Sequence, residues 1–343
     1  MAGNAANPVA NYSRGLSSRG LSSRGLSSQG LSSQGSPAVS LNLQSLIDAR
    51  HDIVRGQSTA NTGRSDFPGQ RTGIRRGHGL EFIDLRQYNP SDDVRHIDWN
   101  VTARSNEPYT RLYREEREHI TTVVVDLRPL MFTGSNKLRS VSASLNAALI
   151  LWQANESGDR CASIVISAAG IQQSRPVAGS KGVLRALELI LQGFDSTQKL
   201  ITGDNHQTRP AIAVLSNALK LINGARGRSG SYFFLSGFDT EDDKHWRNTL
   251  PVTAMTGRMK AILLLDKLEL EGLPEGSYQY RTRRKKVTAR ITSDNRKVLI
   301  DELRLRILQR QVQFADAGIP LLSVSTETAG AEFMAQIINQ KLL

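Results

Sequence analysis

The chain has 343 residues, a formal net charge of +12 at pH 7, 39% hydrophobic residues and 22% charged residues, which is the composition of a soluble globular protein with a sizeable core. Its single cysteine, Cys161, excludes a disulfide framework or a thiolate metal cluster and fits a reducing compartment. No apolar run approaches the ~18 to 20 residues of a membrane helix, and no secretory signal is visible, so we expect a cytoplasmic protein without a membrane span.

The beginning of the chain is a pentapeptide repeat, SRGLS SRGLS SRGLS SQGLS SQGSP, which runs from Ser13 to Pro37. At most one leucine in each unit, among glycine and serine, buries too little apolar surface to offset the conformational entropy lost on ordering. We therefore predict a disordered low-complexity tail over residues 1–40.

Residues 41–118 are predicted to form a separate N-terminal segment. The run LNLQSLIDARHDIV, residues 41–54, has apolar residues near helical spacing and predicts one amphipathic helix that stops at Gly56. Further along, LEFIDLRQY and YTRLYREE resemble strands, and the turn-rich NPSDD separates them.

From residue 119 to residue 343, apolar strands alternate with helices. The predicted strands are TTVVVDL, RCASIVIS, SYFFLSG, MKAILLLD and IPLLSVST; the predicted helices cover residues 137–157, 181–194, 209–224, 241–250, 295–317 and the stretch from about 328, with a hairpin at 277–292. This alternation predicts an α/β fold with a doubly wound, mostly parallel sheet and helices on both faces. Ligands of such sheets bind at the carboxyl ends of the strands. Those ends carry Asp126, Ser236 with Gly237, Asp266 and Thr326.

The block DDVRHIDWNVTAR could be mistaken for an acid/base site, but we interpret it as structural. Catalytic carboxylate pairs need environments that separate their pKa values, and nothing in the sequence indicates such a separation. The expected ion pairs join Asp92, Asp93 and Asp98 to Arg86, Arg95 or Arg104. Trp99 is expected to anchor the segment, and His96 has no second metal ligand at a suitable spacing.

Two glycine-rich stretches do not fit a nucleotide site. RRGHGLEF has no Walker Lys-Ser/Thr pair, and INGARGRSG follows a helix, whereas a phosphate loop follows a strand. No GxSxG elbow is present either. We therefore expect no cofactor and no enzyme activity, and any ATP hydrolysis is expected from a partner.

Positive charge is concentrated in two places. Residues 1–77 contain nine arginines and three aspartates, and RTRRKK places Arg281, Arg283, Arg284, Lys285 and Lys286 together. Neither cluster is interleaved with aromatic residues as a stacking platform for nucleic acid would be. We interpret RTRRKK as a solvated basic hairpin or loop, with binding of nucleic acid or an anionic surface as the alternative function.

The run GLEFIDLRQYNPSDDVRHIDWNVTAR, residues 79–104, resembles the signature of the DUF58 family in its EF…R.Y and DD.R.IDW..tAR blocks. The resemblance continues through YTRLYREER, GDRCASIVIS, LDKLELEGLPEG and GIPLLSVST, and covers roughly residues 41–330. It implies a von Willebrand factor A-like domain. It also implies a non-enzymatic adaptor that acts with a MoxR-type AAA+ ATPase on an unknown protein client.

Von Willebrand A domains hold a divalent ion with a DxSxS turn after the first strand, a threonine and a later aspartate. In this chain the turn reads Asp126-Leu-Arg128-Pro-Leu130, and the later strand ends in Ser236 and Gly237 unless Asp239 replaces the missing acid. A unit charge about 4 Å from a divalent ion costs on the order of 8 kcal/mol at an effective dielectric constant of about 20. We therefore expect no bound metal.

The same residues suggest a binding hypothesis. Arg128 would take the place of the ion, pair with Asp126 and present a permanent cation to an acidic group of a partner, with Ser236 and Asp239 beside it. The alternative is a degenerate turn in which the aspartate caps a loop.

Overall fold

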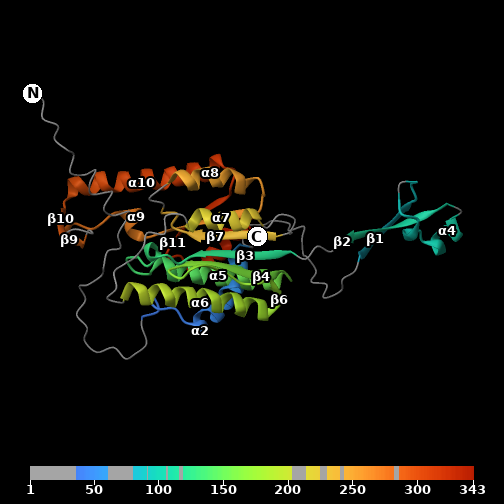
Figure 1. The fold of residues 1–343 in the computed structure, drawn as a ribbon, viewed down its shortest axis with the longest axis horizontal. Helices are drawn as coiled ribbons and strands as arrows, with labels where there is room; N and C mark the ends of the chain where they lie inside the picture. The colour runs from blue at the N-terminus through green and yellow to red at the C-terminus, as the bar shows by residue number, and fades with distance from the viewer. Residues whose placement is uncertain are drawn as a thin grey trace, which may run out of the picture. The chain divides into compact units, whose positions relative to one another are not determined.

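The computed structural model describes residues 36–60, 80–90, 92–105, 107–115, 119–202, 214–224, 230–239, 243–281 and 286–343. The chain divides into two units, which Figure 1 shows as ribbons. The larger unit contains residues 1–69 and 120–343, and the smaller one contains residues 70–119.

The larger unit is built on a seven-stranded sheet in the order β11-β8-β7-β3-β4-β5, with β6 also paired to β4. The strands are β3 (Ile120–Asp126), β4 (Arg160–Ser167), β5 (Gly170–Gln173), β6 (Val177–Ala178), β7 (Gly230–Ser236), β8 (Met259–Leu265) and β11 (Leu321–Ser325). β11, β8, β7, β3 and β4 are parallel, and this confirms the predicted mostly parallel sheet. The short antiparallel strands β5 and β6 were not expected from the sequence.

Helices cover both faces of this sheet (Figure 1). One face carries α2 (Leu43–Asp48), α3 (Arg50–Ala60), α5 (Arg139–Glu156), α6 (Ser180–Thr202) and α11 (Gly330–Asn339); the other carries α7 (Val214–Gly224), α8 (Asp243–Ala254) and α10 (Ser293–Asp316). Along β3, Val123 and Val125 pack into the first core and Val124 into the second. Because successive side chains of a strand point to opposite faces, the apolar run Val123–Val125 contributes to both cores, as expected of a strand between two layers of helices.

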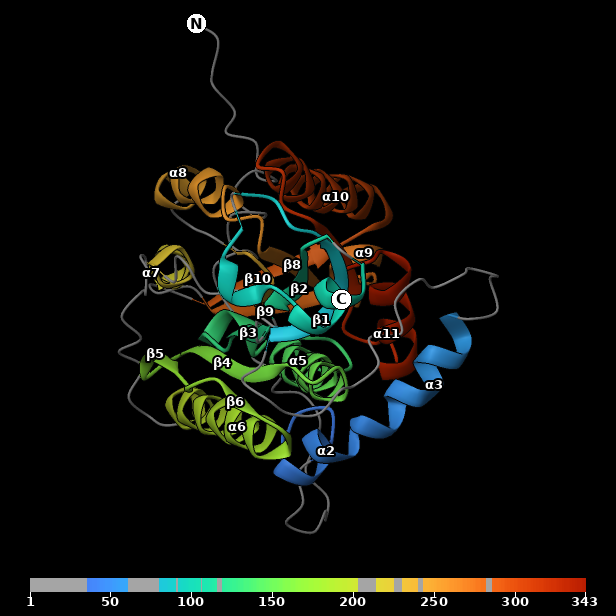
Figure 2. The same cartoon turned by 90° about the vertical axis from the view of Figure 1, so that its right-hand side faces the viewer.

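The predicted N-terminal helix is wrong in two respects. It breaks at Ala49 into α2 and α3, and α3 continues through Gly56 to Ala60. A Cβ atom on Gly56 would lie 2.6 Å from Cβ of Met334 on α11, so the glycine permits a close helix contact and does not end the helix. Helix α3 contacts both α5 and α11, and α2 contacts α5. Figure 2 shows α2 and α3 beside these helices. Residues 41–60 therefore belong to the larger unit, unlike the predicted division of 41–118 from 119–343.

The smaller unit is an antiparallel hairpin with one helix. Strands β1 (Leu80–Gln87) and β2 (Tyr109–Glu115) pair with an irregularity between Phe82 and Asp84. The connection contains the short 3-10 helix η1 (Val94–His96) and α4 (Trp99–Ser105), where only a turn was predicted. Both strands agree with their prediction.

A second hairpin, β9 (Gly276–Arg281) with β10 (Lys286–Ile291), precedes α10 and follows α9 (Lys267–Glu271). This pairing confirms the predicted hairpin at 277–292. Residues 282–285, and with them most of the RTRRKK cluster, lie outside the described residues, as does the repeat tail up to residue 35. No helix in the described ranges is both long and apolar enough to span a membrane.

The Gly56 contact predicts an unequal response to alanine at two helical glycines. Gly56→Ala should destabilise the larger unit by about 1 to 3 kcal/mol, because the new methyl group overlaps Met334 and the carbonyl oxygen of Ala331. Gly224→Ala is the matched control, since a Cβ atom there meets nothing within 4 Å. Urea denaturation should show the control unchanged or slightly stabilised. Equal losses for both variants would contradict the role given to Gly56.

Candidate functional site

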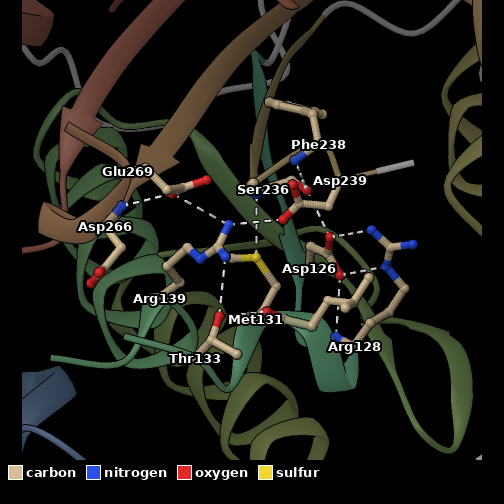
Figure 3. A network of polar contacts seen from close by, with 12 residues as sticks. Asp126, Arg128, Met131, Thr133, Arg139, Ser236, Phe238, Asp239, Asp266 and Glu269 are labelled. Atoms are coloured by element: carbon tan, nitrogen blue, oxygen red, sulfur yellow. Dashed lines mark hydrogen bonds and ion pairs between the residues drawn. The ribbon is translucent and has the colours of Figure 1, made fainter. Parts of the chain in front are cut away.

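The predicted strand ends gather at one edge of the sheet. Asp126 and Ser236 are the last residues of β3 and β7, and Asp266 and Thr326 directly follow β8 and β11. These strands are parallel neighbours, so their carboxyl ends lie side by side. Figure 3 shows the polar network that forms there.

Asp126 occupies the centre of this edge and is fully buried. Its Oδ1 atom accepts hydrogen bonds from the backbone N–H of Arg128 at 3.1 Å and from Nε of Arg128 at 2.9 Å. Its Oδ2 atom accepts from Nη2 of Arg128 at 2.8 Å and from Oγ of Ser236 at 2.7 Å. A carboxylate has about four acceptor sites. The chain's own donors therefore occupy the whole acceptor capacity of Asp126.

The turn after β3 directs Arg128 towards this carboxylate. Arg128 precedes Pro129 and has φ −66° and ψ 160°, the extended conformation that a residue before proline favours. Pro129 begins the 3-10 helix η2 (Pro129–Met131), and Arg128 is only 9% exposed. The hypothesised pairing of Arg128 with Asp126 is thus present in the structure.

The ion pair controls the protonation of both groups. Burial by itself would raise the pKa of Asp126, but the charge of Arg128 and the hydrogen bonds from Arg128 and Ser236 outweigh it and hold the pKa below its ordinary value. Burial likewise opposes the charge of Arg128, yet Asp126 raises the pKa of the guanidinium. Both groups are therefore charged across the physiological pH range.

A second ionic cluster lies beside the first and joins helices from both faces of the sheet. Asp239 accepts from Nη1 of Arg139 on α5 at 2.8 Å and also pairs with Arg310 on α10. Glu269 of α9 lies 3.7 Å from Arg139 and 3.8 Å from Arg310, measured between charged atoms. Burial raises the pKa of Glu269, the nearby Asp239 acts in the same direction, and the arginines oppose the shift only in part. Asp239 thus serves as a bridge and not as an open ligand.

Phe238 explains how Asp239 reaches these arginines. Phe238 has φ 48°, a left-handed conformation that is rare for a residue with a side chain. Its N–H donates to Oγ of Ser236 at 2.8 Å, and its ring contacts those of Phe234 and Phe314. The buried ring and this hydrogen bond hold the strained turn that sends Asp239 across the sheet edge.

Asp266 organises the other side of the edge. It accepts from the N–H and the Oγ of Ser135 at 2.8 and 3.1 Å, and from the N–H of Leu268 at 3.0 Å. Its own N–H donates to Glu269, which completes a capping box at the start of α9. Thr326 is fully buried, and its hydroxyl has no hydrogen-bond partner among the described residues.

The donor set does not fit the divalent ion that the family resemblance implies. Arg128 and Leu130 stand where hydroxyl ligands would be, and both oxygens of Asp126 already accept hydrogen bonds from the chain. Asp239 is held by two arginines. Across the described ranges, no group of three or more acidic, histidine or cysteine side chains is placed to hold a metal. Mg²⁺ needs several free oxygen ligands, which this edge does not offer.

The predicted structural motif of the smaller unit is formed in part. Asp92 pairs with Arg86 as expected, and Asp98 caps α4 by accepting from the N–H groups of Asn100 and Val101. The cation on Asp98 is Arg111 of β2, which was not predicted. That hydrogen bond lowers the pKa of Asp98.

Four other motif residues differ from the expected ion pairs or anchor. Asp93 accepts a hydrogen bond from the backbone N–H of Arg95, and among the described residues its carboxylate forms no ion pair with the Arg95 side chain. Arg95 and Arg104 are both exposed. Trp99 is 66% exposed, so it is not buried as an anchoring residue would be.

Sequence reasoning missed Arg139, Glu269 and Arg310 as parts of the strand-edge network. Glu269 could have been found, because Asp266 and Glu269 after a strand form the spacing of a capping box. Arg139 starts a helix close to the same loop, which is a weaker signal. Arg310 comes from the interior of the 24-residue helix α10, and no local pattern indicates its destination.

The comparison with family models confirms the resemblance to DUF58. A family model described as "Protein of unknown function DUF58" matches residues 84–304. Uncharacterized proteins of Mycobacterium bovis and Mycobacterium tuberculosis are 27% identical over 208 residues, or 60% of this chain; the chain covers 61% of their length, which is less than two thirds. The crystal structure of the conserved hypothetical protein BatB from Bacteroides thetaiotaomicron aligns with a TM-score of 0.37 and 11% identity, covering 66% of this chain and 100% of that one.

The buried ion pair predicts a strong, non-additive stability effect. Arg128→Met should destabilise the larger unit by about 3 to 5 kcal/mol, because it leaves the buried carboxylate of Asp126 without its cation. The double variant Asp126→Asn, Arg128→Met should lose less than Arg128→Met alone. Lys267→Met is the control, since its pair with Glu327 is 4.0 Å long and 42% and 35% exposed, and it should cost less than about 1 kcal/mol. Additive losses in urea denaturation would contradict the pairing.

The lowered pKa of Asp126 predicts when this stabilisation disappears. A depressed folded-state pKa gives stability that is fully present above the unfolded-state value of about 3.9 and is lost as the pH falls through the folded-state value. The difference in unfolding free energy between the wild type and Asp126→Asn should therefore be constant from pH 5 to 7 and shrink below about pH 4. Chemical denaturation at a series of pH values measures it. A difference that changes between pH 5 and 7 would place the titration on another group.

Proposed function

We propose that this chain, which belongs to the DUF58 family of proteins of unknown function, is a non-enzymatic and metal-independent protein-binding module that works as an adaptor with a MoxR-type AAA+ ATPase. The observation that carries the proposal is the saturation of Asp126 by Arg128 and Ser236. An edge that holds its own cation needs no ion in order to offer positive charge to a partner.

The orientation of Arg128 supports the binding role of this edge. Nε and Nη2 face Asp126, and the structure, within the residues it describes, records no partner for Nη1. Figure 3 shows this nitrogen pointing away from Asp126. A guanidinium binds carboxylates strongly through its N–H groups. We propose an acidic side chain of the partner as the acceptor of Nη1.

The competing view of the edge is an acid/base site. Asp126 with its lowered pKa and Glu269 with its raised pKa are shifted in opposite directions, as in many catalytic pairs. Each carboxylate is nonetheless engaged by the chain itself, Asp126 by four hydrogen bonds and Glu269 by two arginines and the N–H of Asp266. A general base must be free to reach a substrate proton, so this arrangement favours binding over catalysis.

The alternative function rests on the basic cluster and the tail. Lys286 pairs with Arg281 in the register of β9 and β10, and the sequence between them contributes three further cations, Arg283, Arg284 and Lys285. Binding of nucleic acid or an anionic surface there would depend steeply on salt, with a slope of about −0.9 in log affinity for each phosphate contact on duplex DNA.

The proposed function predicts that binding depends on Arg128 and not on a metal. The full chain and a purified MoxR-type AAA+ ATPase from the same organism would be compared by biolayer interferometry with and without EDTA. We expect binding unchanged by EDTA, weakened about tenfold or more by Arg128→Gln, and weakened less by Arg128→Lys, which keeps the charge. Lys267→Gln, an exposed cation at the same edge, should bind as the wild type does.

Several outcomes would refute this proposal, provided that thermal melts show each variant to be folded. Loss of binding in EDTA would show that binding requires a divalent ion. ATP or peptide hydrolysis by the chain alone would make it an enzyme. Duplex DNA binding at physiological salt that survives Arg128→Gln and falls when the five cations of RTRRKK are replaced would support the alternative.

A further inference from the structure

Helix α5 begins without the cap that helices normally have. Its N-cap residue is Leu138, whose side chain makes no capping hydrogen bond, and its first turn contains no acidic residue. The N–H of Arg139 donates to the carbonyl oxygen of Thr133. The N–H groups of the next two residues, Ser140 and Val141, have no acceptor in the described part of the chain. The first N–H groups of a helix point out of its end, and each of them needs an acceptor.

These donors are buried. Ser140 is 0% exposed and Val141 is 1% exposed. The hydroxyl of Ser140 is buried as well and, within the described ranges, forms no hydrogen bond. Because the Cα–Cβ bond of a helical residue tilts toward the N-terminus, this hydroxyl lies toward the same end as the free N–H groups. Buried donors without acceptors are rare in proteins, so three of them in one helical turn indicate a ligand that accepts hydrogen bonds.

The charges near this helix end favour an anion as the ligand. The helix dipole places partial positive charge at the N-terminus. Lys137, the residue before the N-cap, forms no ion pair with any described residue, and burial lowers its pKa. Arg139 donates from Nη1 to Asp239 and from Nη2 to Thr133, whereas its buried Nε has no partner among the described residues (Figure 3). A buried water makes about three hydrogen bonds and must also donate, so a site made of donors suits an anion better.

The place of this helix end in the fold is that of a phosphate site. Strand β3 lies between β4 and β7, and the chain leaves β3 through α5 on one face of the sheet and leaves β7 through α8 on the other. The topological switch point is therefore between β3 and β7. Doubly wound sheets bind phosphate groups at such a point, on the N-terminus of the helix that follows the strand. Residues 134–136 of the connecting loop are exposed, so the surface lies within four residues of Ser140 along the chain.

We propose that the N-terminus of α5 binds a phosphate group, which accepts hydrogen bonds from the N–H groups of Ser140 and Val141 and from the hydroxyl of Ser140. Lys137 contributes positive charge, and Nε of Arg139 is a further donor. A phosphate group offers several strong acceptor oxygens, which matches this set of donors. The ligand is inorganic phosphate or the phosphate of a small ester such as a nucleotide. Arg128 takes no part in this site, so the proposal does not rest on the proposed function.

Isothermal titration calorimetry of the full chain with inorganic phosphate, at constant ionic strength, tests the proposal. The wild type should bind, and Ser140→Ala should bind about tenfold or more weakly, because a hydrogen bond to a charged group is lost. Ser144→Ala is the matched control, since that buried hydroxyl already donates to the carbonyl oxygen of Ser140. Lys137→Gln should also weaken binding, and Lys181→Gln, which replaces an exposed lysine in the first turn of α6, should not.

Thermal melts separate a lost ligand contact from a lost fold. The Ser140 hydroxyl has no partner in the described chain, so Ser140→Ala should melt like the wild type in phosphate-free buffer. It should then lose the stabilisation that phosphate gives to the wild type. If Ser140→Ala is destabilised without phosphate, the hydroxyl holds a structural water and the proposal fails.

Two further measurements locate and identify the ligand. Tungstate, an analogue of phosphate, should give its strongest anomalous signal in crystals at the N-terminus of α5. Competition of ADP with phosphate would identify a nucleotide as the source of the group, and phosphate binding without such competition would identify the free ion. Absence of binding by both phosphate and ADP, equal losses for Ser140→Ala and Ser144→Ala, or tungstate beside Arg128 would each overturn the proposal.

Discussion

The carboxylate of Asp126 is a fully buried charge at the end of a central strand, and the edge of the sheet is arranged around neutralising it. Arg128 provides the charge and Ser236 a further hydrogen bond. The hydroxyl oxygen of Ser236 also accepts a hydrogen bond from the N–H of Phe238. The left-handed conformation of Phe238 places Asp239 where it pairs with Arg139 and Arg310. One ion pair is thereby linked to α5 on one face of the sheet and to α10 on the other. An unpaired buried charge destabilises a protein strongly. Removing one member of the network therefore leaves the remaining buried charges without their partners and lowers the free energy of unfolding.

The fold could be predicted from the sequence because its central strands contain short, strongly apolar runs between helical segments. Runs such as TTVVVDL and MKAILLLD are typical of strands buried on both faces, and they place acids at the edge where the network forms. The failures were at contacts between distant segments. In the sequence Gly56 looks like a helix stop. Its role is a close contact with residues 331 and 334 of α11, which the local sequence does not indicate. The antiparallel strands β5 and β6 are too short for periodicity to reveal them.

The candidate site shows the same division. The pairing of Asp126 with Arg128 was predictable because the residues are two apart and Pro129 limits the conformation of Arg128. The fate of Asp239 was not, because its partners come from residues 139 and 310 and from a strained turn at Phe238. Likewise, Asp98 takes Arg111 from across the hairpin in place of the nearer arginines. The sequence therefore showed which charged groups lie at these sites, whereas their partners depend on contacts between segments far apart in the chain.

Under the proposed function, a tethered arginine provides the positive charge that a bound ion would otherwise provide, and this changes what can regulate the site. Occupancy by a divalent ion follows its concentration and contributes free energy that grows with the logarithm of that concentration. A guanidinium two residues from its carboxylate is always present, at an effective concentration far above that of any free ion. Binding at the edge would then respond to the supply of partner and not to ions. The same network, through Arg310, also ties α10 to the sheet edge, so the position of this helix and the charge balance of the edge depend on one set of ion pairs.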